Sequence, residues 1–320
     1  MRKTLISYIP LLCAVLLIGG MAGAADAFQN KEIIFPEIAA IATGALLTPK
    51  LAWRTDPLHI FSAIAVCALL GVCIVLWMPG DVWLQMSAAY LLASVLLLIS
   101  RTSFAPMLSA AVLPVLLQTR SAVYLIAACF LTAGILLLRM ILIRCNILTD
   151  TPFERLPEPD SAACVQTVIR WGIVTAVIFA ALHCHIRYAA APPLLVAFTE
   201  FWKPDAVARR RPITVTALLT LCGLCGAGVR YLLCVRFGIL PCFAAGATML
   251  AVFCIMKRLS LMLPPAAAIA VLAYLIPENA LLMFPLQILC GITVLVGASY
   301  LYPATGAGRI LPHSKTTPGS

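Results

Sequence analysis

Charged side chains are scarce in this chain. Only 11% of its 320 residues are Asp, Glu, Lys or Arg, whereas about 25% is usual for a soluble protein. Hydrophobic residues make up 63% of the chain, and the mean hydropathy is +1.05. So few charges cannot cover so much apolar surface in water, which excludes an ordinary soluble domain. The composition predicts an all-α polytopic membrane protein.

The chain also lacks a compact basic patch and a disulfide framework. Its net charge is +10, but the 22 basic residues are spread beside apolar segments, a pattern typical of membrane topology rather than of nucleic-acid binding. The 13 cysteines are scattered within apolar runs, where a thiol behaves as a small hydrophobic group. We expect the lipid bilayer and a small solute as partners, no nucleic acid, and we leave open a homo-oligomer.

Arrangements of residues that carry catalysis are missing as well. No Ser or Cys has a recognisable base partner, and there is no phosphate-binding loop. The run His183-Cys184-His185 does not have the usual spacing of metal ligands. Cys222 and Cys225 form a C-x-x-C motif inside an apolar helix, without a soluble redox fold around it. We therefore expect no enzyme activity, no cofactor and no metal.

What the chain does contain is one pattern that occurs twice. Each copy has a proline-led short apolar run, a basic loop, two long apolar runs and a second proline-led short run. Two pairs of landmarks have nearly the same spacing along the chain, namely Pro36 with Pro193 and Pro106 with Pro265. The sequence therefore predicts two parallel repeats, each with about four long transmembrane helices and two short proline-led membrane helices.

This duplication divides the chain into a first unit (1–145), a linker (146–162), a second unit (163–303) and a polar C-terminal tail (304–320). The helices expected in the first unit are Thr4–Ala24, Ile33–Leu47, Leu58–Met78, Trp83–Ser100, Ala105–Leu117 and Ala122–Ile143. Those expected in the second unit are Cys164–Leu182, Pro192–Trp202, Ile213–Cys234, Gly238–Met256, Leu263–Ile276 and Ala280–Leu301. The helix Thr4–Ala24 looks like a cleavable signal peptide, but its counterpart in the second unit, Cys164–Leu182, argues that it is retained.

The short helices are the unusual elements. A proline pair such as Pro264-Pro265 suits the first turn of a helix, because its N–H groups would be unpaired there anyway. Leu263–Ile276 is nevertheless shorter than the roughly 20 residues that cross a bilayer upright. If all six segments of each unit cross and the N-terminus is cytoplasmic, most basic residues fall on the inside, including Arg209, Arg210 and Arg211. We therefore expect crossing helices, with the two units related by an axis along the membrane normal.

The second unit carries motifs of a known family. The run Leu263-Pro264-Pro265-Ala266-Ala267-Ala268, an apolar stretch and then Pro277 resemble the signature of the HPP integral-membrane family, His-Pro-Pro-Ala-Gly-Ala at the start of a short helix. Ala191–Phe198, followed by Lys203-Pro204 and the Arg209–Pro212 run, looks like the other recurring motif of that family. The signature histidine is replaced by Leu263 here and by Phe104 in the first unit. The resemblance implies a membrane permease for a small anion such as nitrite.

Two acidic residues fall in matching short helices, and an acid inside a membrane segment is a functional candidate by default. Glu37 either caps its helix or takes part in transport and proton coupling. Glu200 either pairs with Lys203 or an arginine of Arg209–Arg211 or takes part in transport or proton coupling. The helix starts at Pro106 and Pro265 either present N–H groups to a small anion or pack through small residues. The residues expected along a substrate path are Glu37, Thr43, Pro106, Ser109, Pro193, Thr199, Glu200, Pro264 and Pro265.

We therefore expect a transporter or channel-like permease for a small solute, located in the bacterial cytoplasmic (inner) membrane. The alternative is a non-transporting membrane scaffold or accessory protein, and a membrane enzyme acting on lipid ranks third. Trp53, Trp83, Trp171 and Trp202 lie at predicted segment ends, where an aromatic belt at the membrane surface would explain them.

Overall fold

The computed structural model describes residues 8–48, 50–150, 152–153, 155–203 and 206–301. Within these ranges the secondary structure is helical and contains no strand. Seven of the described helices are long and apolar enough to cross a membrane. The all-helical class is thereby confirmed, and the seven helices fit an integral membrane protein.

The seven long helices are α2 (Ile9–Ala27), α4 (Pro57–Trp77), α5 (Val82–Ser100), α7 (Ala122–Arg144), α8 (Ser161–His183), α11 with its π-helical continuation η4 (Pro212–Val229 and Arg230–Arg236) and α12 (Pro241–Arg258). The eighth long helix that the sequence predicts corresponds to α14 (Phe284–Leu301), which has 18 residues, as many as α12. The four short helices are α3 (Glu37–Ala42, continued by the π-helical turn η2, Thr43–Leu47), α6 (Pro106–Leu117), α9 (Pro192–Phe201) and α13 (Pro264–Leu272). A four-residue helix, α10 (Val207–Arg210), lies in the basic loop.

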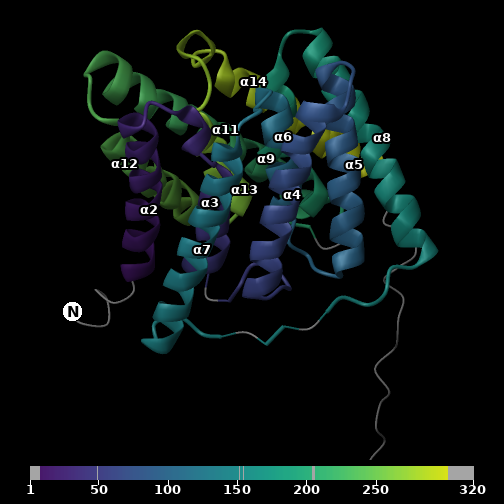
Figure 1. The fold of residues 1–320 in the computed structure, drawn as a ribbon, viewed down its shortest axis with the longest axis horizontal. Helices are drawn as coiled ribbons and strands as arrows, with labels where there is room; N and C mark the ends of the chain where they lie inside the picture. Colours follow the sequence, from purple (N-terminus) through teal and green to yellow (C-terminus); the bar gives the residue numbers. More distant parts are fainter. Residues whose placement is uncertain (1–7, 49, 151, 154, 204–205, 302–320) are drawn as a thin grey trace, which may run out of the picture.

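The short helices lie in the middle of the bundle and the long ones surround them (Figure 1). On one side α2 packs against α12, and on the other α5 packs against α8. Every residue of α3 and α13 is buried, as are those of α6 from Pro106 to Leu116. The long helices instead expose large apolar side chains on their outer faces, for example Phe130 and Ile213, which are 77% and 84% exposed. A helix that is apolar all round belongs in the interior of the bundle, and the exposed apolar faces match contact with lipid.

Prolines set where the short helices begin. Pro106 starts α6, Pro192 starts α9 and Pro264 starts α13. The residue before a proline is driven away from helical geometry, and Leu263 accordingly has an extended backbone, with φ −123° and ψ 103°. These starts agree with the sequence prediction to within one residue.

Several predicted boundaries are wrong. The segment predicted as one helix, Ile33–Leu47, starts at the last residue of a 3₁₀ turn (η1, Lys31–Ile33) and continues through an extended Ile34 before α3 begins at Glu37. The predicted helix Leu263–Ile276 ends as a helix at Leu272, and the last predicted helix begins at Phe284 rather than at Ala280. Pro285 explains that start, because proline fits the first turn of a helix. Part of the first predicted helix (4–7) and the polar tail (304–320) lie outside the described residues.

The helix α8 begins at Ser161, three residues before its predicted start at Cys164. Asp160 caps this helix, its carboxylate accepting a hydrogen bond of 2.8 Å from the backbone N–H of Ala163. Figure 1 shows the linker running along one end of the bundle, from the end of α7 to the start of α8, and α2 begins at this same end.

Two glycines let long helices touch short ones closely. A Cβ atom added to Gly71 of α4 would lie 2.2 Å from the carbonyl oxygen of Ala111 in α6. A Cβ atom added to Gly226 of α11 would lie 2.1 Å from the carbonyl oxygen of Ala270 in α13. Contacts this short with rigid backbone exclude any side chain, so each short helix is held backbone to backbone against its long neighbour.

We expect Gly226→Ala to destabilise the protein by about 1–3 kcal/mol, because the added methyl group forces α11 and α13 apart. Gly228 is the matched control, since it lies on the same helix and a Cβ there meets no atom within 4 Å. Gly228→Ala should leave stability unchanged or raise it slightly through helix propensity. Thermal unfolding of both variants in detergent tests this, and equal melting temperatures would contradict the close crossing.

Candidate functional site

The first turns of the four short helices surround one small cavity. Each helix contributes two residues one turn apart, and they are Glu37 and Ala40, Pro106 and Ser109, Pro193 and Val196, and Pro265 and Ala268. The space between them is about 10 Å³, close to the least that one water molecule needs. We call this place the junction. It brings together five of the nine predicted path residues from four separate parts of the chain.

Glu37 is the one acidic residue that lines the junction, and it is only 1% exposed. Its Oε1 atom accepts a hydrogen bond from the hydroxyl group of Ser109 in α6. Its Oε2 atom is buried and has no hydrogen-bond partner among the described residues. The carboxyl group is therefore held at one oxygen and unsatisfied at the other, which is unusual for a buried polar group.

The helix starts around the junction have few N–H groups to offer. Prolines remove the N–H at one or two positions at the start of α6, α9 and α13. The amides of Leu108, Leu194 and Ala266 donate to carbonyl groups three residues earlier, over 2.8–3.0 Å. Few free N–H groups are therefore left at these helix starts to bind an anion. The helix dipoles are the remaining source of positive potential.

Glu200 lies at the other end of its helix, apart from the junction. Its Oε1 atom accepts a hydrogen bond of 3.1 Å from the indole N–H of Trp53. The hydrogen-bond partner of Glu200 is thus the indole of Trp53. The sequence had suggested Lys203 or an arginine as its partner. Lys203, Leu263 and Pro264 line a cavity of about 270 Å³ together with this pair.

Trp53 is only 4% exposed, so a place in a surface belt is wrong for it. Its ring lies edge-on to Phe104, with the ring centroids 5.1 Å apart. Gly44 makes room for it, because a Cβ there would lie 2.3 Å from the indole. Leu263 lines the same cavity as Trp53.

At the far end of α13, Arg230 is buried and closes the helix. It donates hydrogen bonds of 2.5 and 2.6 Å to the carbonyl oxygens of Ala273 and Ile276. With Asp26, Lys31 and Tyr274 it lines a cavity of about 240 Å³. In the first half of the chain a second buried arginine, Arg139, donates to the carbonyl oxygen of Ala45 in η2. Neither buried arginine was among the residues that the sequence singled out.

The remaining predicted residues hold the short helices in shape. The hydroxyl groups of Thr43 and Thr199 donate to the carbonyl oxygens of Ala39 and Leu195, over 2.8 and 2.9 Å. The hydroxyl of Tyr90 in α5 also forms a 2.8 Å hydrogen bond with Thr199. Neither threonine lines the junction, so both have a structural role in the contacts that are observed.

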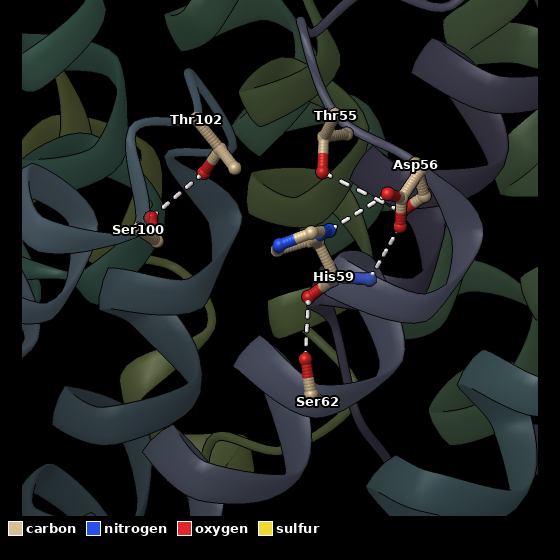
Figure 2. A network of polar contacts seen from close by, with 6 residues as sticks. All are labelled: Thr55, Asp56, His59, Ser62, Ser100 and Thr102. Atoms are coloured by element: carbon tan, nitrogen blue, oxygen red, sulfur yellow. Dashed lines mark hydrogen bonds and ion pairs between the residues drawn. The ribbon is translucent and has the colours of Figure 1, made fainter. Parts of the chain in front are cut away.

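A polar cluster at the start of α4 was not foreseen. Figure 2 shows Asp56 contacting His59, whose backbone N–H and ring Nδ1 each lie 2.8 Å from a carboxylate oxygen. Partial burial opposes ionisation of Asp56, but these hydrogen bonds outweigh it and hold the pKa of its carboxyl group below the usual range. The signal was present, since Asp followed by Pro is a common start of a helix.

The neighbouring loop forms a wide basic cavity at this end of the bundle. It measures about 670 Å³, and Lys50, Arg54 and Lys203 are its basic lining residues. Linker residues Pro152 and Leu156 line it as well, which places it at the end of the bundle where the linker runs (Figure 1). In the described part of the chain, no group of three or more His, Cys, Asp or Glu side chains could hold a metal ion.

No family model matches this chain, and neither a curated protein nor a solved structure matches it. The apolar helices define the class as an integral membrane protein.

We expect Arg230→Met to lower stability by about 1–3 kcal/mol, because it leaves two carbonyl groups at the end of α13 without their donor. Arg236→Met is the control, since Arg236 is exposed on the same helical continuation. Thermal unfolding in detergent should separate the two variants. Equal stability of both would show that the guanidinium group of Arg230 does not hold the helix end.

We expect Asp56→Ala to cost about 0.5–2 kcal/mol near neutral pH through loss of the helix cap. Because the pKa of Asp56 is lowered in the folded state, its charge contributes stability above the unfolded value of about 3.9 and loses it as the pH falls. The difference from the wild type should therefore shrink in acid. Asp56→Asn keeps a capping side chain without a charge. The difference in melting temperature between Asp56→Asn and Asp56→Ala should therefore not vary with pH.

Proposed function

We propose that this protein is a membrane transporter or channel-like permease for a small solute, and that the solute passes through the junction. The supporting observation is that α13 has a cavity at each end, one with Glu200 and one with Arg230. Between them α13 has nine residues, or about 14 Å of helix. The stretch of packed protein that separates the two cavities is thus about half the roughly 30 Å thickness of a bilayer core.

We also propose that the chain consists of two tandem HPP-like units related by a two-fold axis that passes through the junction. The lining residues support this, because each one from the first half has a counterpart in the second. Glu37 and Ala40 take the places of Pro193 and Val196 at the junction, one residue out of step with the pairing of Pro36 and Pro193 in the sequence. Pro106 and Ser109 have one common spacing from Pro265 and Ala268.

The packing of the helices supports the same proposal. α4 contacts α6 and α7, and α11 contacts α13 and α14 in the corresponding way. The close glycine crossings also correspond, because Gly71 of α4 packs against α6 and Gly226 of α11 packs against α13. With α2 and α8 both beginning at the linker end of the bundle (Figure 1), the two units are parallel.

The orientation follows from the basic cavity. Lys50, Arg54 and Lys203 gather at the linker end, and basic residues favour the cytoplasmic side. This supports a cytoplasmic N-terminus, whereas the bacterial inner membrane stays a prediction from the sequence.

The solute class is narrowed by the two charged regions. The basic cavity attracts anions, which supports the small anion, such as nitrite, that the family resemblance implies. An ionised Glu37 in the junction would repel the same anion. An anion therefore passes most easily together with a proton that neutralises this carboxylate.

The alternative is a non-transporting scaffold or accessory protein. The narrowness of the junction favours it, since a space of about 10 Å³ admits no more than about one water molecule without rearrangement. A scaffold would show no flux of any small solute.

The test is solute flux into proteoliposomes, measured with nitrite, nitrate and uncharged urea. We expect flux of at least one of these solutes through the wild type and its loss in Ala268→Ile, which fills the junction. Ala247→Ile makes the same chemical change on the exposed side of α12 and should keep the flux. If the wild type passes none of these solutes, the transport proposal is wrong.

A further inference from the structure

We propose that Glu37 is a proton-binding site whose Oε2 atom takes up and releases a proton inside the junction. The coupling of this proton to solute movement rests on the proposed transport function, whereas the binding of the proton does not. The geometry that carries the proposal is a buried carboxyl group with one free oxygen beside a cavity of the size of one water molecule.

No cation of the described residues neutralises Glu37. Of the elements packed against α3, the helices α6 and α13 and the turn η2 contain no charged residue. The helix α7 carries Arg139, which instead donates to Ala45 in η2, and Arg144 in its last turn. The helix α2 carries Asp26 near its end. An ion pair therefore does not explain why a carboxyl group lies here.

The neighbouring hydroxyl groups of Tyr124 and Ser109 already donate hydrogen bonds, and neither donates to Oε2 of Glu37. Tyr124 of α7 lies close enough for its charge to interact with that of Glu37, but its hydroxyl donates to the carbonyl oxygen of Ala110, over 3.0 Å. Ser109 is already the donor to Oε1. The Oε2 atom of Glu37 therefore has no protein donor among the described residues.

Two opposing effects make both protonation states accessible. Burial without a cation penalises the ionised carboxylate. The starts of α6, α9 and α13 face the junction, and the positive ends of their dipoles favour negative charge there. The hydrogen bond from Ser109 favours it too. A carboxyl group between these effects is suited to exchange a proton, whereas burial alone would keep it neutral.

The exchange needs no other reactant than water. A hydronium ion arriving from one of the cavities at the ends of α13 gives its proton to Oε2, which forms the O–H bond and leaves a water molecule. The reverse step returns the proton to water on the other side. Ser109 can donate to Oε1 in both states, so it acts as a positioning residue that holds the carboxyl group at this oxygen and leaves Oε2 for the proton.

Infrared difference spectroscopy of the full chain in lipid nanodiscs tests this directly. Spectra recorded between low and high pH should contain the C=O band of a protonated carboxylic acid that disappears as the pH rises. This band should be lost in Glu37→Gln and retained in Glu278→Gln, which changes an exposed acid near the other end of α13. Ser109→Ala should keep the band but shift its midpoint on the pH axis.

The proposal is overturned if no pH-dependent carboxylic band is lost in Glu37→Gln, whether because the group is always protonated or always ionised. Flux through proteoliposomes separates this result from failure of the transport proposal. A titrating Glu37 in a protein without flux leaves the proton site standing and removes only the transport function. Flux with an unchanged pH profile in Glu37→Gln, together with no titrating band, removes the proton site and keeps transport.

Discussion

The structure depends on one constraint, which is that a helix ending inside a bilayer must find partners for its free backbone groups within the protein. The four short helices meet this constraint with different devices at their two ends. At the starts, prolines remove N–H groups that would otherwise be unpaired, as at Pro106 and Pro264. Just after the end of α13, the buried guanidinium group of Arg230 donates to the carbonyl oxygens of Ala273 and Ile276, and that of Arg139 donates to the carbonyl oxygen of Ala45 within η2.

Pairing the backbone groups at the helix ends also decides where the short helices can lie. Once its ends are satisfied, a short helix can lie wholly inside the bundle, and four of them can bring their first turns to one point. The glycine crossings at Gly71 and Gly226 hold two of these helices against their neighbours, which fixes the small space between the four starts. Glu37 lies in this space with one oxygen free. A packed core would gain nothing from such a group, so its presence is the strongest sign that the junction does more than hold the helices together.

Much of this arrangement could be predicted from the sequence, because it follows from local chemistry. Pairs such as Pro264-Pro265 predict helix starts to within one residue, and the acid at Glu37 was recognised as a candidate. The partners could not be predicted, since they come from distant segments. Nothing near Arg230 in the sequence says that it closes α13, and nothing near Trp53 says that it contacts Glu200. The hydrogen bond between Glu37 and Ser109 likewise depends on how α3 and α6 pack.

The central claim is that the four proline-led helices meet within the membrane around Glu37. An electron cryo-microscopy map of the full chain in a lipid nanodisc tests it most directly. The account predicts that the starts of α3, α6, α9 and α13 converge between the two headgroup layers, with the Glu37 side chain beside Ser109. A map in which these starts lie apart, or in which Glu37 reaches the headgroup layer, would contradict it.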